Sequence, residues 1–267
     1  MDKKTLSEMS GENENGGAPK LVLNQIRFNG KKGTYFYEDV KAGLIEKDGK
    51  KTYGKTDIGN EIKITFLKIR RRLYQFRKDE KALTTNEHNH IGCRVSLFGN
   101  DKVENGIASE LREKYPQLRT QQIIYALYRG ELVRLIIKGA SLGSKSKPKD
   151  VDDFYSYISK FSGKDEHFYE YNTILSVGEE NGDLGEYYVM HFTRGNKLDN
   201  LDDVSSNMEI AFNYCNEADK YYVSRMPVPE KLKSLVTNQN RPKVEEIDTI
   251  EYPEAEDEDL SVDDIPF

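Results

Sequence analysis

The sequence contains only two cysteines and no long apolar run, and each of these shortages excludes a class of protein. It also contains no tryptophan, so any aromatic stacking surface consists of Tyr and Phe. Two thiols, Cys93 and Cys215, are too few for a disulfide framework in a chain of 267 residues, and they fit a reducing compartment. No run approaches the ~18 apolar residues that a membrane helix needs, and the polar N-terminus has no secretory-signal stretch. We therefore expect a soluble intracellular protein.

Nucleotide-binding and catalytic signatures are missing as well. The sequence contains no P-loop, no Gly-x-Gly-x-x-Gly and no serine-centred nucleophile elbow. His88, His90 and Cys93 offer three zinc-ligand types, but a structural site needs a fourth ligand and the spacing fits no common zinc finger. A polar turn that leads into a strand explains these residues better, so we expect no metal and no cofactor.

Four carboxylates raise the alternative of a metal-dependent nuclease. Asp152 and Asp153 precede a helical segment, and Glu166 and Glu170 follow it. Acidic residues at the start of a helix are more simply explained by their favourable interaction with the helix dipole. We therefore predict a protein that is not an enzyme and keep a DNA-acting nuclease as an alternative.

The net charge of −6 is distributed unevenly along the chain. Residues 244–267 contain eleven acids and no Lys or Arg, which leaves 35 acids against 40 bases in residues 1–243, a charge of +5. A basic body with an acidic tail is typical of nucleic-acid-binding proteins, although such a tail can also simply aid solubility.

Periodicity predicts a body of short strands with a few helices. The expected strands are residues 34–37, one long or bulged strand over 61–77, then 91–98, 121–128, 131–138, 168–177 and 186–194. Arg129-Gly130 predicts a tight hairpin between 121–128 and 131–138. Apolar residues at helical spacing predict helices over 107–115, 150–161 and 204–215, and a last turn over 227–236.

Strands, one helix and then a hairpin follow the order of an OB-fold, although other α+β domains share it. We therefore predict an α+β protein with an OB-like β-barrel core elaborated by extra strands and helices. The expected divisions are a disordered N-terminus (1–18), an OB-like body (19–236) and a linker with an acidic tail (237–267).

The segment 68–78 (KIRRRLYQFRK) combines six cations with two aromatic residues. On a strand, alternate residues share a face, so Lys68, Arg70, Arg72, Tyr74 and Phe76 are expected to point the same way. Cations that follow phosphates, beside rings that stack on bases, suit single-stranded DNA. A solvated edge strand that carries cations against aggregation is the alternative.

Neighbouring predicted strands add further cations and rings to this surface. The complete set of expected DNA-binding residues is Lys68, Arg70, Arg71, Arg72, Tyr74, Phe76, Arg77, Lys78, Arg94, Tyr125, Tyr128, Arg134 and Lys138.

The chain ends in Asp263, Asp264, Ile265, Pro266 and Phe267, directly behind the acidic stretch. This peptide resembles the C-terminal tip of bacterial single-stranded-DNA-binding proteins. A partner with an apolar pocket beside a cation can bind both the phenylalanine ring and the terminal carboxylate, and proline lowers the entropy lost on binding. The resemblance is confined to the tail.

The resemblance implies a role in DNA replication, recombination and repair, in the cytoplasm of a bacterial cell or a phage-infected host. It implies that the tip recruits helicases, primases or polymerases while the body protects single-stranded DNA. Two alternatives from the residues stay open beside the nuclease: a recombination mediator or annealing protein, and an adaptor that does not bind DNA.

Overall fold

The computed structural model describes residues 21–28, 36–47, 50–78, 80–99, 102–143, 150–162, 165–182 and 185–226. All of them belong to one compact unit, Met1–Pro227. The predicted disordered N-terminus, the turn over 227–236 and the acidic tail lie outside the described residues. None of the helices in the described ranges is both long and apolar enough to cross a membrane.

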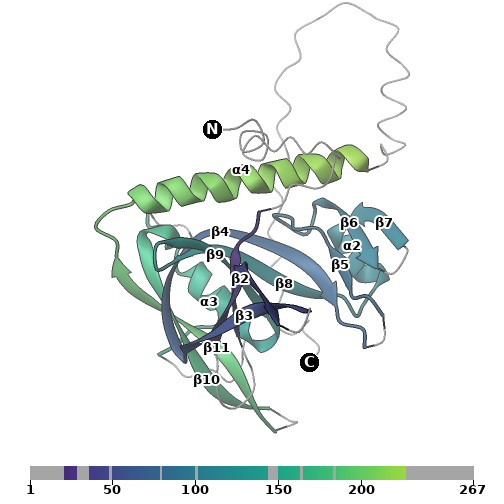
Figure 1. Ribbon diagram of the computed structural model, residues 1–267. Helices are drawn as coiled ribbons and strands as arrows, with labels where there is room; N and C mark the ends of the chain where they lie inside the picture. Colours follow the sequence, from purple (N-terminus) through teal and green to yellow (C-terminus); the bar gives the residue numbers. More distant parts are fainter. Residues whose placement is uncertain are drawn as a thin grey trace, which may run out of the picture. The chain divides into compact units, whose positions relative to one another are not determined.

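The body is built on one large sheet, with three α-helices in its described part (Figure 1). The strands are β1 (Asn24–Phe28), β2 (Phe36–Lys47), β3 (Lys50–Gly59), β4 (Glu61–Gln75), β5 (Leu83–Thr85), β6 (Arg94–Gly99), β7 (Lys102–Ile107), β8 (Arg119–Tyr128), β9 (Glu131–Lys138), β10 (Tyr171–Gly182) and β11 (Gly185–Lys197). The helices are α2 (Ala108–Lys114), α3 (Phe154–Ser159) and α4 (Asp202–Arg225), with 3-10 turns at Gly139–Ser141 and Phe168–Glu170.

The strand order is β3-β2-β1-β9-β8-β4-β5-β6-β7, and β10 pairs with both β4 and β11. Every described pairing is antiparallel except β1 with β9. The sheet is open rather than closed into a barrel. The α+β class is therefore confirmed, whereas the OB-like barrel core is not.

Strand β4 is the longest element of the sheet and pairs with three neighbours. Its first residues pair with β10, its middle with β8 and its end with β5. The register shifts between Phe66 and Lys68, so Leu67 is an extra residue, a β-bulge. The prediction for 61–77 was either one long strand or two strands joined by a bulge, and the structure has a single strand, β4, with a bulge inside it.

The main core lies on one face of the sheet, which we call the core face. Phe66 of β4 contacts the rings of Phe154 and Tyr157 on α3 and of Phe192 on β11. The side chain of Asp153 caps α3 by accepting a hydrogen bond from the Ser156 amide. This supports the explanation of the acidic pair as helix-terminal residues.

The hairpin between β8 and β9 has the predicted turn. Arg129 and Gly130 both have positive φ angles, 53° and 80°, as a two-residue turn of the primed type requires. The predicted helix before Pro116 is also present as α2. It packs with β6 and β7 around a smaller apolar cluster that includes Leu73, Val95 and Leu111.

Helix α4 packs on the opposite face of the sheet, against β4, β8 and β6 (Figure 1). We call this side the α4 face. The helix turns Val204, Ala211 and Cys215 toward the strands. It extends ten residues beyond the predicted end at Cys215, through a stretch in which polar residues interrupt the apolar pattern.

Candidate nucleic-acid interface

The bulge in β4 determines which of its cations lie on the α4 face. After Leu67 the alternation places Lys68, Arg70 and Arg72 on the α4 face. The Lys68 ammonium lies 5.0 Å from the ring centre of Phe212 on α4. Arg71 occupies the opposite face, between Ile69 and Leu73. The predicted shared face of Lys68, Arg70, Arg72 and Tyr74 is therefore present, and a helix crosses it.

Arg70 is the most buried cation of this face, with 1% of its surface exposed. Its guanidinium makes a two-pronged contact with Asp219 of α4, at 2.9 Å to Oδ2 and 2.5 Å to Oδ1. It also donates to Asn89 Oδ1 and to the carbonyl oxygen of Glu87. Burial lowers the pKa of Arg70, but the hydrogen bond and charge of Asp219 raise it by more. Arg70 is thus a fully charged, paired residue under α4.

Glu87 connects strands β4, β8 and β9, because its carbonyl oxygen accepts from Arg70 and its carboxylate binds one residue on each of the other two. Its carboxylate accepts a hydrogen bond from the Tyr125 hydroxyl on β8 at 2.7 Å and one from Arg134 on β9 at 3.2 Å. Tyr125 is 1% exposed, and its pKa is raised, chiefly by burial. Tyr125 is therefore a neutral donor in this network and is not open to stacking with a base.

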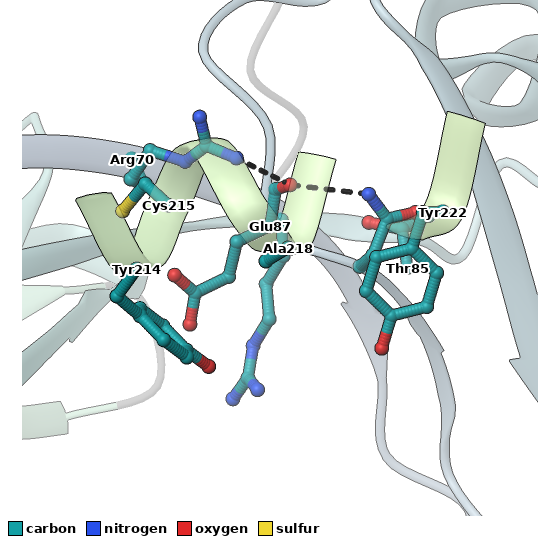
Figure 2. Close-up of a pocket in the computed structure, with 9 residues that line it drawn as sticks. Arg70, Thr85, Glu87, Tyr214, Cys215, Ala218 and Tyr222 are labelled. Carbon is teal, nitrogen blue, oxygen red and sulfur yellow. Dashed lines mark hydrogen bonds between the residues drawn. The ribbon is translucent and has the colours of Figure 1, made fainter. Parts of the chain in front are cut away.

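A cavity of about 170 Å³ lies between α4 and the sheet. Figure 2 shows residues that line it: Tyr214, Cys215, Ala218 and Tyr222 come from the helix, and Arg70, Thr85 and Glu87 come from the sheet and the loop after β5. Arg72 and Asn86 complete its lining.

Arg72 lies where the cavity meets the uncovered sheet. Its Nε donates to Gln121 at 2.9 Å, and its guanidinium lies 5.4 Å from the Tyr74 ring centre. Burial lowers the pKa of Arg72, and the nearby charge of Arg134 lowers it further. The carboxylate of Glu87 acts in the opposite sense and raises this pKa, so Arg72 lies between a like charge and an opposite one.

Beside α4, cations on four adjacent strands form a continuous surface. Strand register aligns Arg72 with Gln121 and Lys138, and Tyr74 with Arg119. Paired side chains on neighbouring strands lie about 5 Å apart, so these groups are within reach of one extended ligand. We call this set the cationic strip: Arg27, Arg72, Tyr74, Arg119, Arg134 and Lys138. Arg27, Arg119 and Lys138 are exposed.

The remaining predicted residues lie outside the strip. Phe76 is 73% exposed just past the end of β4, where Lys78 is also exposed. Arg77 pairs with Glu80 at 2.6 Å. Tyr128 is buried in the main core and Arg94 lies on β6, away from the four strands of the strip.

Sequence reasoning missed Arg27, Arg119, Gln121 and Glu87. Arg119 and Gln121 lie at alternate positions before Tyr125 on β8, so strand alternation would have predicted that they share its face. Arg27 lies on β1, which was not recognised as a strand.

The candidate metal ligands have other roles. His88 is buried and its Nδ1 lies 3.1 Å from the carbonyl oxygen of Asn86. Burial, and then the charges of Arg71 and Arg70, lower the His88 pKa to about 4. Across the described ranges no three His, Cys, Asp or Glu residues are grouped so as to hold a metal ion.

The candidate nuclease carboxylates each have their own partner. Asp152 pairs with Lys160, and Glu166 makes a two-pronged contact with Arg194 at 2.9 and 3.0 Å. Glu170 lies 3.8 Å from Lys197. They do not converge on one site.

The predicted docking peptide, residues 263–267, lies outside the described residues. No known protein family, curated protein or solved structure matches this chain.

Proposed function

We propose that this protein binds single-stranded DNA without sequence preference, along the cationic strip. The observation that carries the proposal is the placement of Arg72, Lys138 and Arg119 on adjacent strands, with Arg119 aligned with Tyr74 and the exposed Phe76 just past the end of β4. Cations that follow a sugar–phosphate backbone beside rings that stack on bases are the two elements of sequence-tolerant binding.

The chemistry divides between the two kinds of side chain. The guanidinium groups of Arg119 and Arg134 and the ammonium group of Lys138 bind phosphate oxygens, and arginine does so with two parallel hydrogen bonds. Phe76 and Tyr74 stack on bases, each stacked base contributing about 1–3 kcal/mol. Because every base has a flat face, this arrangement does not discriminate between sequences.

The tail adds a second part to the proposed function. Asp263, Asp264 and the terminal Ile265-Pro266-Phe267 form a peptide that a replication, recombination or repair protein binds through an apolar pocket with a basic rim. Helicases, primases and polymerases are the proposed partners. Eleven acids in residues 244–267 raise the rate of encounter with such a rim.

Fluorescence anisotropy with labelled oligo-dT at several salt concentrations tests the proposal. We expect tight binding at low salt, and the logarithm of the binding constant should fall linearly with the logarithm of the salt concentration. Arg119→Ala and Lys138→Ala should each reduce the slope by about 0.7, because each removes one phosphate contact. Lys63→Ala, an exposed cation at the other end of β4, is the matched control and should leave the slope unchanged.

Absence of binding even at very low salt would overturn the proposed function. Two further assays on the same protein distinguish the rival activities. Faster pairing of complementary strands would indicate an annealing protein or recombination mediator, and metal-dependent degradation of the oligonucleotide would indicate a nuclease.

A further inference from the structure

The contact between Arg70 and Asp219 has the geometry of an arginine bound to phosphate. Two parallel N–H···O bonds, at 2.9 and 2.5 Å, join the guanidinium to both carboxylate oxygens. A phosphate group offers a pair of oxygens to the same fork. Asp219 belongs to α4 and lies 149 positions after Arg70 in the chain. A helix from elsewhere in the sequence thus fills a position suited to an anionic ligand.

The sheet beneath α4 continues the cationic strip. Lys68 and Arg70 precede Arg72 on the same face of β4, and Lys68 is aligned with Tyr125, which is itself aligned with Arg134 on β9. These covered residues are of the same kinds as those that the strip exposes. Removal of the helix would therefore lengthen one surface rather than create a separate one.

Helix α4 is held unequally along its length. Near its start, Val204 packs in an apolar cluster with Leu67 and Leu127, and Leu198 and Leu201 of the preceding segment join it. Farther along, the small side chains of Ala211 and Cys215 are buried against Ile123 and Tyr125 of β8, and Tyr214 packs on the same cluster.

The second half of the helix combines apolar contacts with a polar contact and a cavity. The Arg70–Asp219 pair and the cavity of about 170 Å³ both lie there, beside the ring contacts of Tyr214 with Tyr125 and of Tyr222 with Phe98, and Met226 is buried directly after the helix. The buried ion pair belongs to the second half alone, so this is the half in which an anion can take the place of a helix side chain.

We propose that α4 is a displaceable cover of the DNA-binding face, and that Asp219 occupies the place of a backbone phosphate on Arg70 until single-stranded DNA replaces it. The inference rests on the proposed function, because it extends the same site. When the second half of α4 leaves, Lys68, Arg70 and Tyr125 join the strip. Arg70 then exchanges one anionic partner for another and is never left buried and unpaired.

The thiol of Cys215 reports on the position of the helix. It belongs to α4 and is buried between the helix and the sheet, and burial raises its pKa to about 11, so it reacts slowly while the helix is closed. In a Cys93→Ser background, Asp219→Asn should raise the fraction of molecules in which the second half of α4 is displaced. Cys215 should then react with a thiol reagent about threefold faster or more, and oligo-dT should bind more tightly by a similar factor.

Glu217→Gln is the matched control for Asp219→Asn. It removes the same charge from an exposed position of α4 two residues away, without a contact to Arg70. It should leave the labelling rate unchanged. Equal labelling rates in the two variants would overturn the role of Asp219 as a latch.

A reversible cross-link tests displacement directly. Phe98→Cys and Tyr222→Cys, with Cys93→Ser and Cys215→Ala, place two thiols where rings now meet at a centroid distance of 5.7 Å. A short cleavable bis-thiol linker then ties the second half of α4 to β6. We expect the linked protein to bind oligo-dT about tenfold more weakly than the same protein after the linker is cleaved.

The outcomes separate the two proposals. If the protein binds oligo-dT tightly after the linker is cleaved and equally tightly while it is linked, the displaceable cover is overturned and the proposed function stays in place. No binding by either form, and none by the unmodified chain, would overturn the proposed function itself.

Discussion

The α4 face has a covered part and an open part, and both are made of the same kinds of residue. Lys68, Arg70 and Tyr125 lie under the helix, whereas Arg119 and Lys138 lie beside it and are exposed. In the covered part, carboxylates from other elements bind Arg70 and Tyr125, and Lys68 lies over the Phe212 ring. In the open strip, Arg119 and Lys138 are exposed on their strands. The chemical type of a strand residue therefore does not decide its role; what packs on the strand does.

The largest difference between the two parts should be in stability. Arg70→Leu leaves Asp219, Asn89 and the Glu87 carbonyl without their donor, so the free energy of unfolding should fall by about 3 kcal/mol. Arg119→Leu, in the open strip, should change it by no more than about 0.5 kcal/mol. Urea denaturation of both variants measures the difference. Equal decreases in the free energy of unfolding would mean that the covered and open parts do not differ in what they contribute to stability.

The pH dependence of stability should also come from the covered part. The folded-state pKa of His88, about 4, lies below its ordinary value of 6.5. Since the unfolded chain binds the proton more readily, His88 contributes stability that is complete above pH 6.5 and is lost as the pH falls toward 4. We expect a loss of about 3 kcal/mol over that range.

His88→Asn should flatten this dependence, as measured by urea midpoints at pH 7 and pH 5. His90→Asn is the control, because His90 is exposed and only two residues away. A His88→Asn protein with the same pH dependence as the unmodified chain would contradict the assignment. Arg70, Arg71 and Asp219 are the charged groups that act on His88, so substitution of any of them should change the urea midpoint as well.

The smallest expected difference is in base stacking at the open end of β4. Phe76→Ala should weaken oligo-dT binding about fivefold, which corresponds to about 1 kcal/mol, the low end for one stacked base. Phe76→Tyr should retain the affinity, and Tyr155→Ala, which removes an exposed ring on α3, should leave it unchanged. If Phe76→Ala bound as well as the unmodified protein, stacking would have to be assigned to Tyr74 alone.

Local patterns in the sequence predicted much of the sheet. Arg129-Gly130 predicted the hairpin because few residues accept two consecutive positive φ angles, and the basic run from Lys68 predicted a shared face because strand alternation is strict. Long-range pairing had no local signal. The parallel pairing of β1 with β9, which places Arg27 in the strip, and the pairing of β10 with β4 both join distant segments.

The covering of Arg70 could not be predicted for the same reason. Asp219 lies in a part of α4 where polar residues obscure the apolar spacing, and nothing near Arg70 in sequence indicates it. The OB-like barrel was inferred from element order alone, and order does not determine whether a sheet closes. The open edge strands β3 and β7 show that it does not close here.

The bulge at Leu67 makes β4 unequally tolerant of deletions. Leu67 and Lys68 both lie on the α4 face, so loss of Leu67 would restore plain alternation without moving Arg70 or Arg72 to the other side. Loss of one residue from the regular stretch that follows would instead rotate every later side chain by half a turn and bring a guanidinium into the apolar core. Within the stretch of β4 paired with β8, a deletion at the bulge therefore keeps the charge pattern, and a deletion after it does not.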